Sequence, residues 1–183
     1  MKFISQSIPG LILIEPKIYG DERGYFTETF RKDLFEKALG YKVNFIQDNE
    51  SRSVKGVLRG LHYQIPPFEQ NKLVRVIEGS VLDVVVDIRK DSSTFGRHVA
   101  IELNEDNKCQ LFIPRGFAHG FVVLSNYSIF SYKVDNYYSP SNERGIAFDD
   151  EQLAIDWILS KKDLQLSIKD QNHPKLADKK LLL

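Results

Sequence analysis

Residues 56–64 have the sequence GVLRGLHYQ, which places a histidine and an arginine in a segment apolar enough to form a strand of a packed sheet. Side chains alternate between the faces of a strand, so Leu58, Gly60 and His62 share one face and Arg59 lies on the other. A β-bulge at Gly60 would bring Arg59 and His62 to the same side. The segment predicts a strand with His62 pointing into a barrel. Taken alone, His62 is better explained as a hydrogen-bonded interior side chain.

Most of the chain around this strand predicts further short strands separated by turns. Their expected ranges are 10–15, 25–30, 43–47, 72–77, 80–88, 99–103, 109–113, 121–124 and 128–134. Residues 72–77 and 80–88 flank Glu78-Gly79, the clearest hairpin signal in the sequence. In residues 80–88, one face of the expected strand is apolar throughout and the other carries Asp83 and Asp87.

The remaining segments predict turns, loops and a little helix. Turns or loops are expected at residues 19–24, 49–55 and 114–120. Helical spacing is found at residues 31–39, followed by Gly40 as a C-terminal stop, and returns at 151–158 and in the tail. Many short strands with few helices predict an all-β sandwich or barrel, and a jelly roll is the natural closure. With no repeat, low-complexity run or linker, residues 1–183 are expected to form a single domain.

Composition excludes several classes of function. The 25 Lys and Arg residues balance the 25 Asp and Glu residues, so no overall field attracts nucleic acid or an anionic membrane. The single cysteine, Cys109, excludes an internal disulfide and a cysteine-based metal cluster. The first residues lack the apolar run of a signal peptide, and no stretch is long and apolar enough to span a membrane. We therefore expect a cytoplasmic protein.

Two histidines on strands of one barrel raise the question of a metal site. Residues 114–119, PRGFAH, match the later half of the cupin metal pattern, but His62-Tyr63-Gln64 has glutamine where a second histidine ligand belongs. An amide oxygen replaces imidazole poorly at a transition metal. Even with Glu69, the first shell is incomplete. The expectation is no metal, with the ligand positions used for acid–base chemistry.

Five longer runs resemble the dTDP-4-dehydrorhamnose 3,5-epimerase family, and the similarity extends over essentially the whole chain. They are GVLRGLHYQ at 56–64, KLVRVIEGSVLDVVVD at 72–87, PRGFAHGFVVLS at 114–125, YYSPSNERGI at 137–146 and LSIKDQNHP at 166–174. The departures are SSTFG at 92–96 and Tyr127-Ser128, and neither is at a position expected to be catalytic.

The resemblance implies a double-stranded β-helix, that is, a cupin-type jelly roll with a few short helices, and a homodimer without a cofactor. The implied substrate is a dTDP-linked 4-keto-6-deoxy sugar, epimerised at C3 and C5 through an enolate. Such chemistry needs a base on one face, an acid on the other and a cation near O4. By resemblance, the base is His62, whose partner is Asp170. The acid is Tyr132, and the cation is Lys72. Without the resemblance, Tyr132 would be better explained as a core tyrosine.

The resemblance also assigns substrate-binding positions. Arg59 and Arg23 are expected to grip the diphosphate, since guanidinium groups fit phosphate oxygens in pairs. Tyr138 is expected to stack on the thymine ring. The other expected contacts are Glu28, Gln47, Asn49, His119, Glu143 and Lys169. Arg23 and Glu28 lie on an N-terminal segment that the family resemblance places across the partner's site.

Three alternatives stay open from the sequence. One is a related epimerase that inverts a single centre or acts on another 4-keto-6-deoxy sugar. A ketoisomerase of dTDP-4-keto sugars is less compatible with Tyr132 and Asp170. The third is a sugar-nucleotide binding module without catalysis, against which the combination of His62, Lys72, Tyr132 and Asp170 argues.

Overall fold

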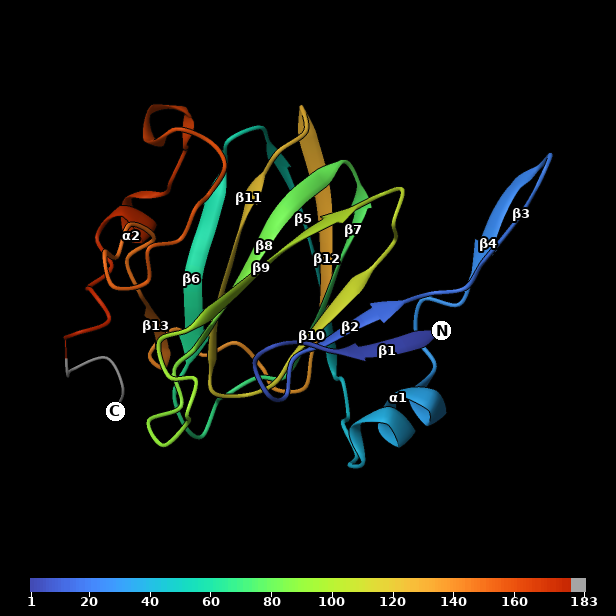
Figure 1. Cartoon of the computed structure of the whole chain (residues 1–183), viewed down its shortest axis with the longest axis horizontal. Coiled ribbons are helices and arrows are strands. Elements are labelled where there is room, and N and C mark those ends of the chain that lie inside the picture. The colour runs from blue at the N-terminus through green and yellow to red at the C-terminus, as the bar shows by residue number, and fades with distance from the viewer. Residues whose placement is uncertain (179–183) are drawn as a thin grey trace.

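The computed structural model describes residues 1–178 and is built mainly from two facing β-sheets (Figure 1). Residues 179–183 of the predicted single domain lie outside the described part. The six-stranded sheet has the order β1 (Lys2–Ser5), β2 (Ile12–Glu15), β10 (Gln110–Ile113), β7 (Lys72–Glu78), β12 (Tyr127–Val134) and β5 (Gln47–Val54). The five-stranded sheet has the order β13 (Glu143–Gly145), β6 (Leu58–Gln64), β11 (Phe117–Val123), β8 (Ser80–Asp87) and β9 (His98–Asn104). The predicted all-β jelly roll is confirmed.

The remaining elements lie outside these two sheets. A separate hairpin of β3 (Ile18–Asp21) and β4 (Gly24–Thr27) projects away from the body of the molecule (Figure 1). Helix α1 (Lys32–Leu39) ends at Gly40, whose φ of 79° is left-handed, as the sequence predicts. Helix α2 (Ile168–Gln171) and a short 3₁₀ turn at Lys161–Asp163 belong to the C-terminal segment. None of the helices described is long and apolar enough to cross a membrane.

Two apolar cores hold the five-stranded sheet, one on each face. Val81 and Val85 of β8 pack between the sheets with Phe121 and Phe130. On the other face, the C-terminal segment covers the sheet with residues such as Trp157. A strand covered on both faces needs apolar residues of both parities, which explains the nearly continuous apolar sequence of β8. The two carboxylates on β8 are therefore buried, and each must find a partner inside the protein.

The predicted hairpin around Glu78-Gly79 is wrong. Strand β7 belongs to the six-stranded sheet and β8 to the five-stranded sheet, so the chain passes from one sheet to the other at this turn. Gly79 has a φ of 80°, and a Cβ there would lie 2.1 Å from the carbonyl oxygen of Tyr127. Gly79 thus allows a tight turn between the two sheets. Locally this turn has the same sequence pattern as a hairpin turn, which explains the wrong prediction.

Several predicted boundaries also need correction. Residues 47–54, expected mostly as a polar loop, form strand β5, whereas residues 43–46 do not form a strand. Asn49 and Ser51 of β5 border a cavity, so the inward face of this edge strand is polar and lacks the usual apolar alternation. Residues 19–21, expected in a turn, belong to β3. Residues 117–120 belong to β11. Residues 151–154 form a turn and residues 155–158 are irregular, so the helix expected at 151–158 does not form.

The predicted bulge at Gly60 is confirmed. In the pairing of β6 with β11, His62 is opposite His119 and Arg59 is opposite Phe121, so three steps on β6 match two on β11. Arg59 and His62 consequently face the same cavity. The bulge also corrects the predicted parity, because Leu58 packs with the C-terminal core and not on the side of His62.

Gly60→Ala should lower the free energy of unfolding by ~3 kcal/mol or more, because a Cβ would lie 2.5 Å from Gly120 Cα at a φ of 124°. Gly24→Ala is the matched control, since Gly24 has a φ of 128° and open space around it. It should lose only the ~1–3 kcal/mol of backbone strain. Urea unfolding of both variants measures the difference, and equal losses would contradict a role for close packing at Gly60.

Candidate active site

A cavity of about 390 Å³ opens between the two sheets and collects most of the predicted site residues. Its walls carry ionisable side chains from both sheets and from the segment around α2. The lining residues are Asn49, Glu50, Ser51, Arg59, His62, Lys72, His119, Gly120, Phe121, Phe130, Tyr132, Ser167, Lys169 and Asp170. Concave sites with a few convergent polar groups are the usual places for small-molecule chemistry.

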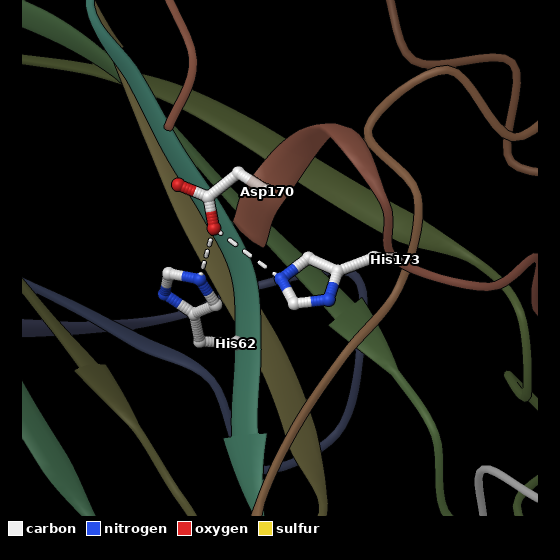
Figure 2. A group of neighbouring side chains, drawn as sticks. All are labelled: His62, Asp170 and His173. Carbon is white, nitrogen blue, oxygen red and sulfur yellow. Dashed lines mark hydrogen bonds and ion pairs between the residues drawn. The ribbon is translucent and has the colours of Figure 1, made fainter. Parts of the chain in front are cut away.

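His62 and Asp170 meet although 108 residues separate them in the chain. The His62 Nε2 atom lies 2.5 Å from Asp170 Oδ1, and Nε2 of His173 lies 3.3 Å from the same oxygen (Figure 2). An ionised carboxylate only accepts hydrogen bonds, so the imidazole N–H groups donate. Nδ1 of His62 faces away from Asp170 in Figure 2, and within residues 1–178 this nitrogen has no hydrogen-bond partner.

The start of α2 delivers Asp170 to the cavity. Ser167 caps the helix, accepting a hydrogen bond from the Asp170 backbone N–H and donating its hydroxyl to Asp170 Oδ2 at 2.9 Å. Burial disfavours the charged carboxylate, but hydrogen bonds from His173, His62 and Ser167 outweigh it and hold the pKa of Asp170 well below its ordinary value. Asp170 is therefore an anion that can stabilise a protonated His62.

His119 forms a second histidine–aspartate pair in the same cavity. Its Nε2 atom lies 2.8 Å from Oδ2 of Asp83, which is fully buried on β8. The ring stacks against Phe130 with a centroid separation of 6.2 Å. No hydrogen-bond partner for Asp83 Oδ1 is found within residues 1–178.

Lys72, at the start of β7, brings a cation into the cavity wall. Within the described chain, its ammonium group has no hydrogen bond or ion pair. Burial lowers its pKa to about 8, although the negative charges of Asp83 and Glu143 act in the opposite direction. This lysine is available to a ligand.

Tyr132 lines the cavity from β12, in the sheet opposite to that of His62. Burial raises the pKa of Tyr132, with the nearby Arg59 acting in the opposite direction. The phenol is thus a neutral hydrogen-bond donor at neutral pH. Tyr132 and His62 thus line the cavity from opposite sheets.

The other expected contacts lie around the cavity or at its rim. Arg59 donates to Ser53 Oγ at 3.1 Å, and Gln47 donates to Asn49 at 2.7 Å. Tyr138 donates its hydroxyl to Glu143 at 2.6 Å, which raises the pKa of Tyr138 to about 12.

Lys169 pairs with the same Glu143 carboxylate as Tyr138. Burial opposes the charged form of this carboxylate, but hydrogen bonds from Lys169 and Tyr138 prevail and lower the pKa of Glu143.

Arg23 and Glu28 are not brought to this cavity. Arg23 is at the turn between β3 and β4 and pairs with Asp21 at 2.5 Å. The hairpin itself projects away from the two sheets (Figure 1). Glu28 pairs with Arg31 at 3.2 Å. The hairpin exposes apolar side chains, including Tyr25 and Phe26. Within one chain, these two residues do not contribute to the site.

A family model described as dTDP-4-dehydrorhamnose 3,5-epimerase matches residues 5–178. The chain belongs to this epimerase family. It is therefore an isomerase. The dTDP-4-dehydrorhamnose 3,5-epimerase of Shigella flexneri is 52% identical over 178 residues, which cover 97% of each chain.

Solved structures agree with this assignment. A dTDP-6-deoxy-D-glucose-3,5-epimerase from Legionella pneumophila, in complex with dTDP-4-keto-L-rhamnose, is 52% identical, with a TM-score of 0.94 over 99% of this chain and 96% of that one. A 3'-monoepimerase from Streptomyces bikiniensis, in complex with dTDP-quinovose, is 35% identical, with a TM-score of 0.87 over 94% and 86%. Double and single epimerases thus share the fold.

His62, Asp170 and His173 are also the described residues that could hold a metal ion, because their donor atoms lie within 4.8 Å of one another. Both imidazole N–H groups point at the carboxylate, so an ion would have to replace existing hydrogen bonds. Three donors are too few for a closed structural site but equal the ligand count of a catalytic one, so it is these hydrogen bonds that disfavour an ion. For this epimerase the absence of a metal stays a prediction.

Dialysis against EDTA should leave turnover and the unfolding temperature unchanged, because the hydrogen bonds around Asp170 need no ion. The measurement is the initial rate and the thermal unfolding curve after dialysis, beside a sample dialysed without chelator. Activity lost with EDTA and restored by a divalent ion would contradict a metal-free site.

His173 and Asp83 belong to the site but were not predicted from the sequence. His173 follows Asp170 by three residues, a spacing that places two side chains on one side of a helical turn, and this was the available signal. Asp83 stands on an otherwise apolar strand, so its burial required a partner inside the protein. The identity of that partner, His119, depends on the pairing of β8 with β11.

Proposed function

We propose that this chain epimerises dTDP-4-dehydro-6-deoxy-D-glucose at C3 and C5 to dTDP-4-dehydro-L-rhamnose without a cofactor, in dTDP-L-rhamnose biosynthesis. The observation that carries the proposal is the arrangement of His62 and Tyr132, which line one cavity from opposite sheets. Inversion requires a proton to leave from one face of a carbon and to return on the other. Groups on facing walls meet this requirement.

His62 is the proposed base. The carbonyl at C4 acidifies the protons at C3 and C5, because the electron pair left on carbon delocalises onto O4 as an enolate. Nδ1 of His62 takes the proton, and the resulting imidazolium keeps its Nε2–H on the Asp170 carboxylate. Tyr132 then gives its phenolic proton to the opposite face of the carbon, and solvent restores both groups. Each centre ends with the same atoms and the inverted configuration.

Lys72 is the proposed cation beside O4. Charge on O4 develops as the enolate forms, and an ammonium group placed beside it stabilises this charge without first leaving a protein partner. The absence of a hydrogen bond or ion pair to Lys72 within residues 1–178 supports this role.

The value of kcat/KM should fall on the alkaline side of pH about 8, because burial lowers the pKa of Lys72 to about 8. Lysine is charged below its pKa, so the stabilisation of O4 is present at lower pH and is lost as the pH rises. The measurement is kcat/KM from pH 6 to 10. The Lys72→Arg variant should be slower than the parent, but its kcat/KM should no longer fall at high pH because arginine stays charged. A flat parent profile up to pH 10 would contradict the role.

The nucleotide half of the substrate is assigned to the remaining expected contacts. Arg59 binds the diphosphate, and Tyr138 stacks on thymine. The other contacts within the chain are Gln47, Asn49, His119, Glu143 and Lys169. The charge balance supports this assignment, since Lys169 and Glu143 neutralise each other and leave Arg59 for the phosphates.

A homodimer completes the proposal. In it, the N-terminal segment brings Arg23 and Glu28 to the partner's site, and this is supported by the exposed apolar side chains of the projecting β3–β4 hairpin. Ile18, Tyr19, Tyr25 and Phe26 would be covered by a second copy. A cytoplasmic location and the lack of nucleic-acid or membrane partners stay as predictions from the sequence.

Proton exchange in deuterated water tests the proposal. Incubation with dTDP-4-keto-6-deoxyglucose should place one deuteron at C3 and one at C5, and the product should be the doubly inverted sugar. One deuteron would indicate the single-centre alternative. A related structure is a 3'-monoepimerase, so C3 is the carbon at which a single deuteron would be expected. No deuteron would indicate a binding module or a different substrate.

A further inference from the structure

His173 shares the oxygen of Asp170 on which His62 depends. The two Nε2 atoms lie 3.3 Å and 2.5 Å from Asp170 Oδ1, and the two rings meet edge to face with centroids 5.4 Å apart (Figure 2). The second carboxylate oxygen is held separately by Ser167. Both oxygens of Asp170 are thus held by hydrogen bonds, and Oδ1 accepts from two imidazoles at once.

His173 lies beside Asp170 and is not among the described residues that line the cavity. Its side chain is 8% exposed. Whatever His173 contributes to the reaction must therefore pass through Asp170 and His62. This distinguishes it from Lys72, Tyr132 and His119, which border the cavity themselves.

Gly145 makes the space for the His173 ring. Strand β13 pairs with β6 so that Gly145 is opposite His62. A Cβ at Gly145 would lie 2.3 Å from both Cε1 and Nε2 of His173. The backbone angles of Gly145 are not in the left-handed region, so it is the ring of His173 that excludes a side chain here.

We propose that His173 is a positioning residue that sets the strength of the His62 base by taking part of the hydrogen-bonding capacity of Asp170. The proposal rests on the proposed role of His62. An imidazolium held too firmly by an unshared carboxylate would take protons but return them slowly, and general acid–base catalysis is most efficient when the proton affinity suits the operating pH. A second donor on Oδ1 weakens the hold of Asp170 on the protonated His62 and stops the carboxylate from rotating.

Both carboxylates and cations surround His62 at the cavity. The titratable side chains from the elements packed around His62 are Glu50, Arg59, Lys72, His119, Tyr132, Glu143, Lys169, Asp170 and His173. In this set His173 is the group that competes for the oxygen bound by His62 Nε2.

Three variants separate the hydrogen bond from the ring. His173→Phe keeps the ring and removes the donor, whereas His173→Gln keeps an amide donor that reaches the position of Nε2 and cannot titrate near neutral pH. Gly145→Ala keeps His173 but drives its ring out of place. Thermal unfolding of each variant establishes that it is folded at the assay temperature.

His173→Phe should lower kcat roughly tenfold or more, the usual effect of losing a hydrogen bond to a charged group, with KM unchanged. The acid limb of its pH–rate profile should move to higher pH, since Asp170 Oδ1 would then accept a hydrogen bond from His62 alone. Gly145→Ala should show the same two changes, and His173→Gln should retain most of the parent kcat and the parent acid limb.

The outcomes distinguish this inference from the proposed function. An inactive parent protein would overturn the assignment of the reaction and would be seen before any variant is made. With an active parent, a His173→Phe variant with parent kcat and an unmoved acid limb would overturn the role of His173. A loss of kcat that His173→Gln does not restore, or a loss that follows stability alone without a moved limb, would also overturn it.

Discussion

His62→Ala should lower turnover by ~10²–10⁴-fold and abolish deuterium uptake at both C3 and C5, with the protein still folded. The side chain of His62 is 27% exposed at the cavity wall and belongs to neither apolar core, so its removal leaves the packing between and behind the sheets intact. Asp170 keeps two of its partners, His173 and Ser167, and does not become an unpaired buried charge.

His98→Ala is the matched control for this experiment. His98 is also a strand histidine of the five-stranded sheet, but it lies on β9 and does not line the cavity. It should exchange and turn over like the parent. Proton NMR of the sugar in deuterated water measures exchange at each carbon separately. Exchange at C3 or C5 in His62→Ala at a rate near that of the parent would assign the base for that carbon to another residue.

Two features of the site could be predicted from the strand that contains His62. Two glycines and a histidine within residues 56–64 predicted both an interior histidine and the bulge that turns Arg59 toward it. The bulge could be predicted because a glycine inside a strand often marks a bulge, and this signal depends only on the local sequence. Helix α1 and its stop at Gly40 were predictable for the same reason, since both depend on neighbouring residues.

Features that depend on distant parts of the chain were not predictable in the same way. The turn at Gly79 has the local signature of a hairpin, and only the assignment of β7 and β8 to different sheets makes it a corner. Strand β5 appeared to be a loop because the cavity, which other strands form, replaces the apolar core on its inner face. Asp83 acquires its role from His119, 36 residues away, and the role of His173 depends on the contact of Asp170 with His62, which spans 108 residues.

The position of Tyr132 explains why exchange and inversion should be separable. Tyr132 is opposite Asn49 and Val74 in the six-stranded sheet, whereas His62 belongs to the five-stranded sheet. A base on one wall can remove and return a proton on the same face, which exchanges it without inverting the carbon. Inversion needs a donor on the other wall. Burial raises the pKa of Tyr132, so its phenol holds a proton at neutral pH.

Tyr132→Phe should therefore keep taking up deuterium through His62 while inversion at C5 falls by ~10²–10⁴-fold. The ring and its packing near Phe130 remain, so folding and substrate binding should survive. Water can partly replace the donor at C3, so a product inverted at one centre should accumulate. Tyr127→Phe, on the same strand but bonded to Glu78 away from the cavity, is the control and should form the doubly inverted sugar normally. If Tyr132→Phe also forms it at the parent rate, Tyr132 is a core tyrosine and another group donates the proton.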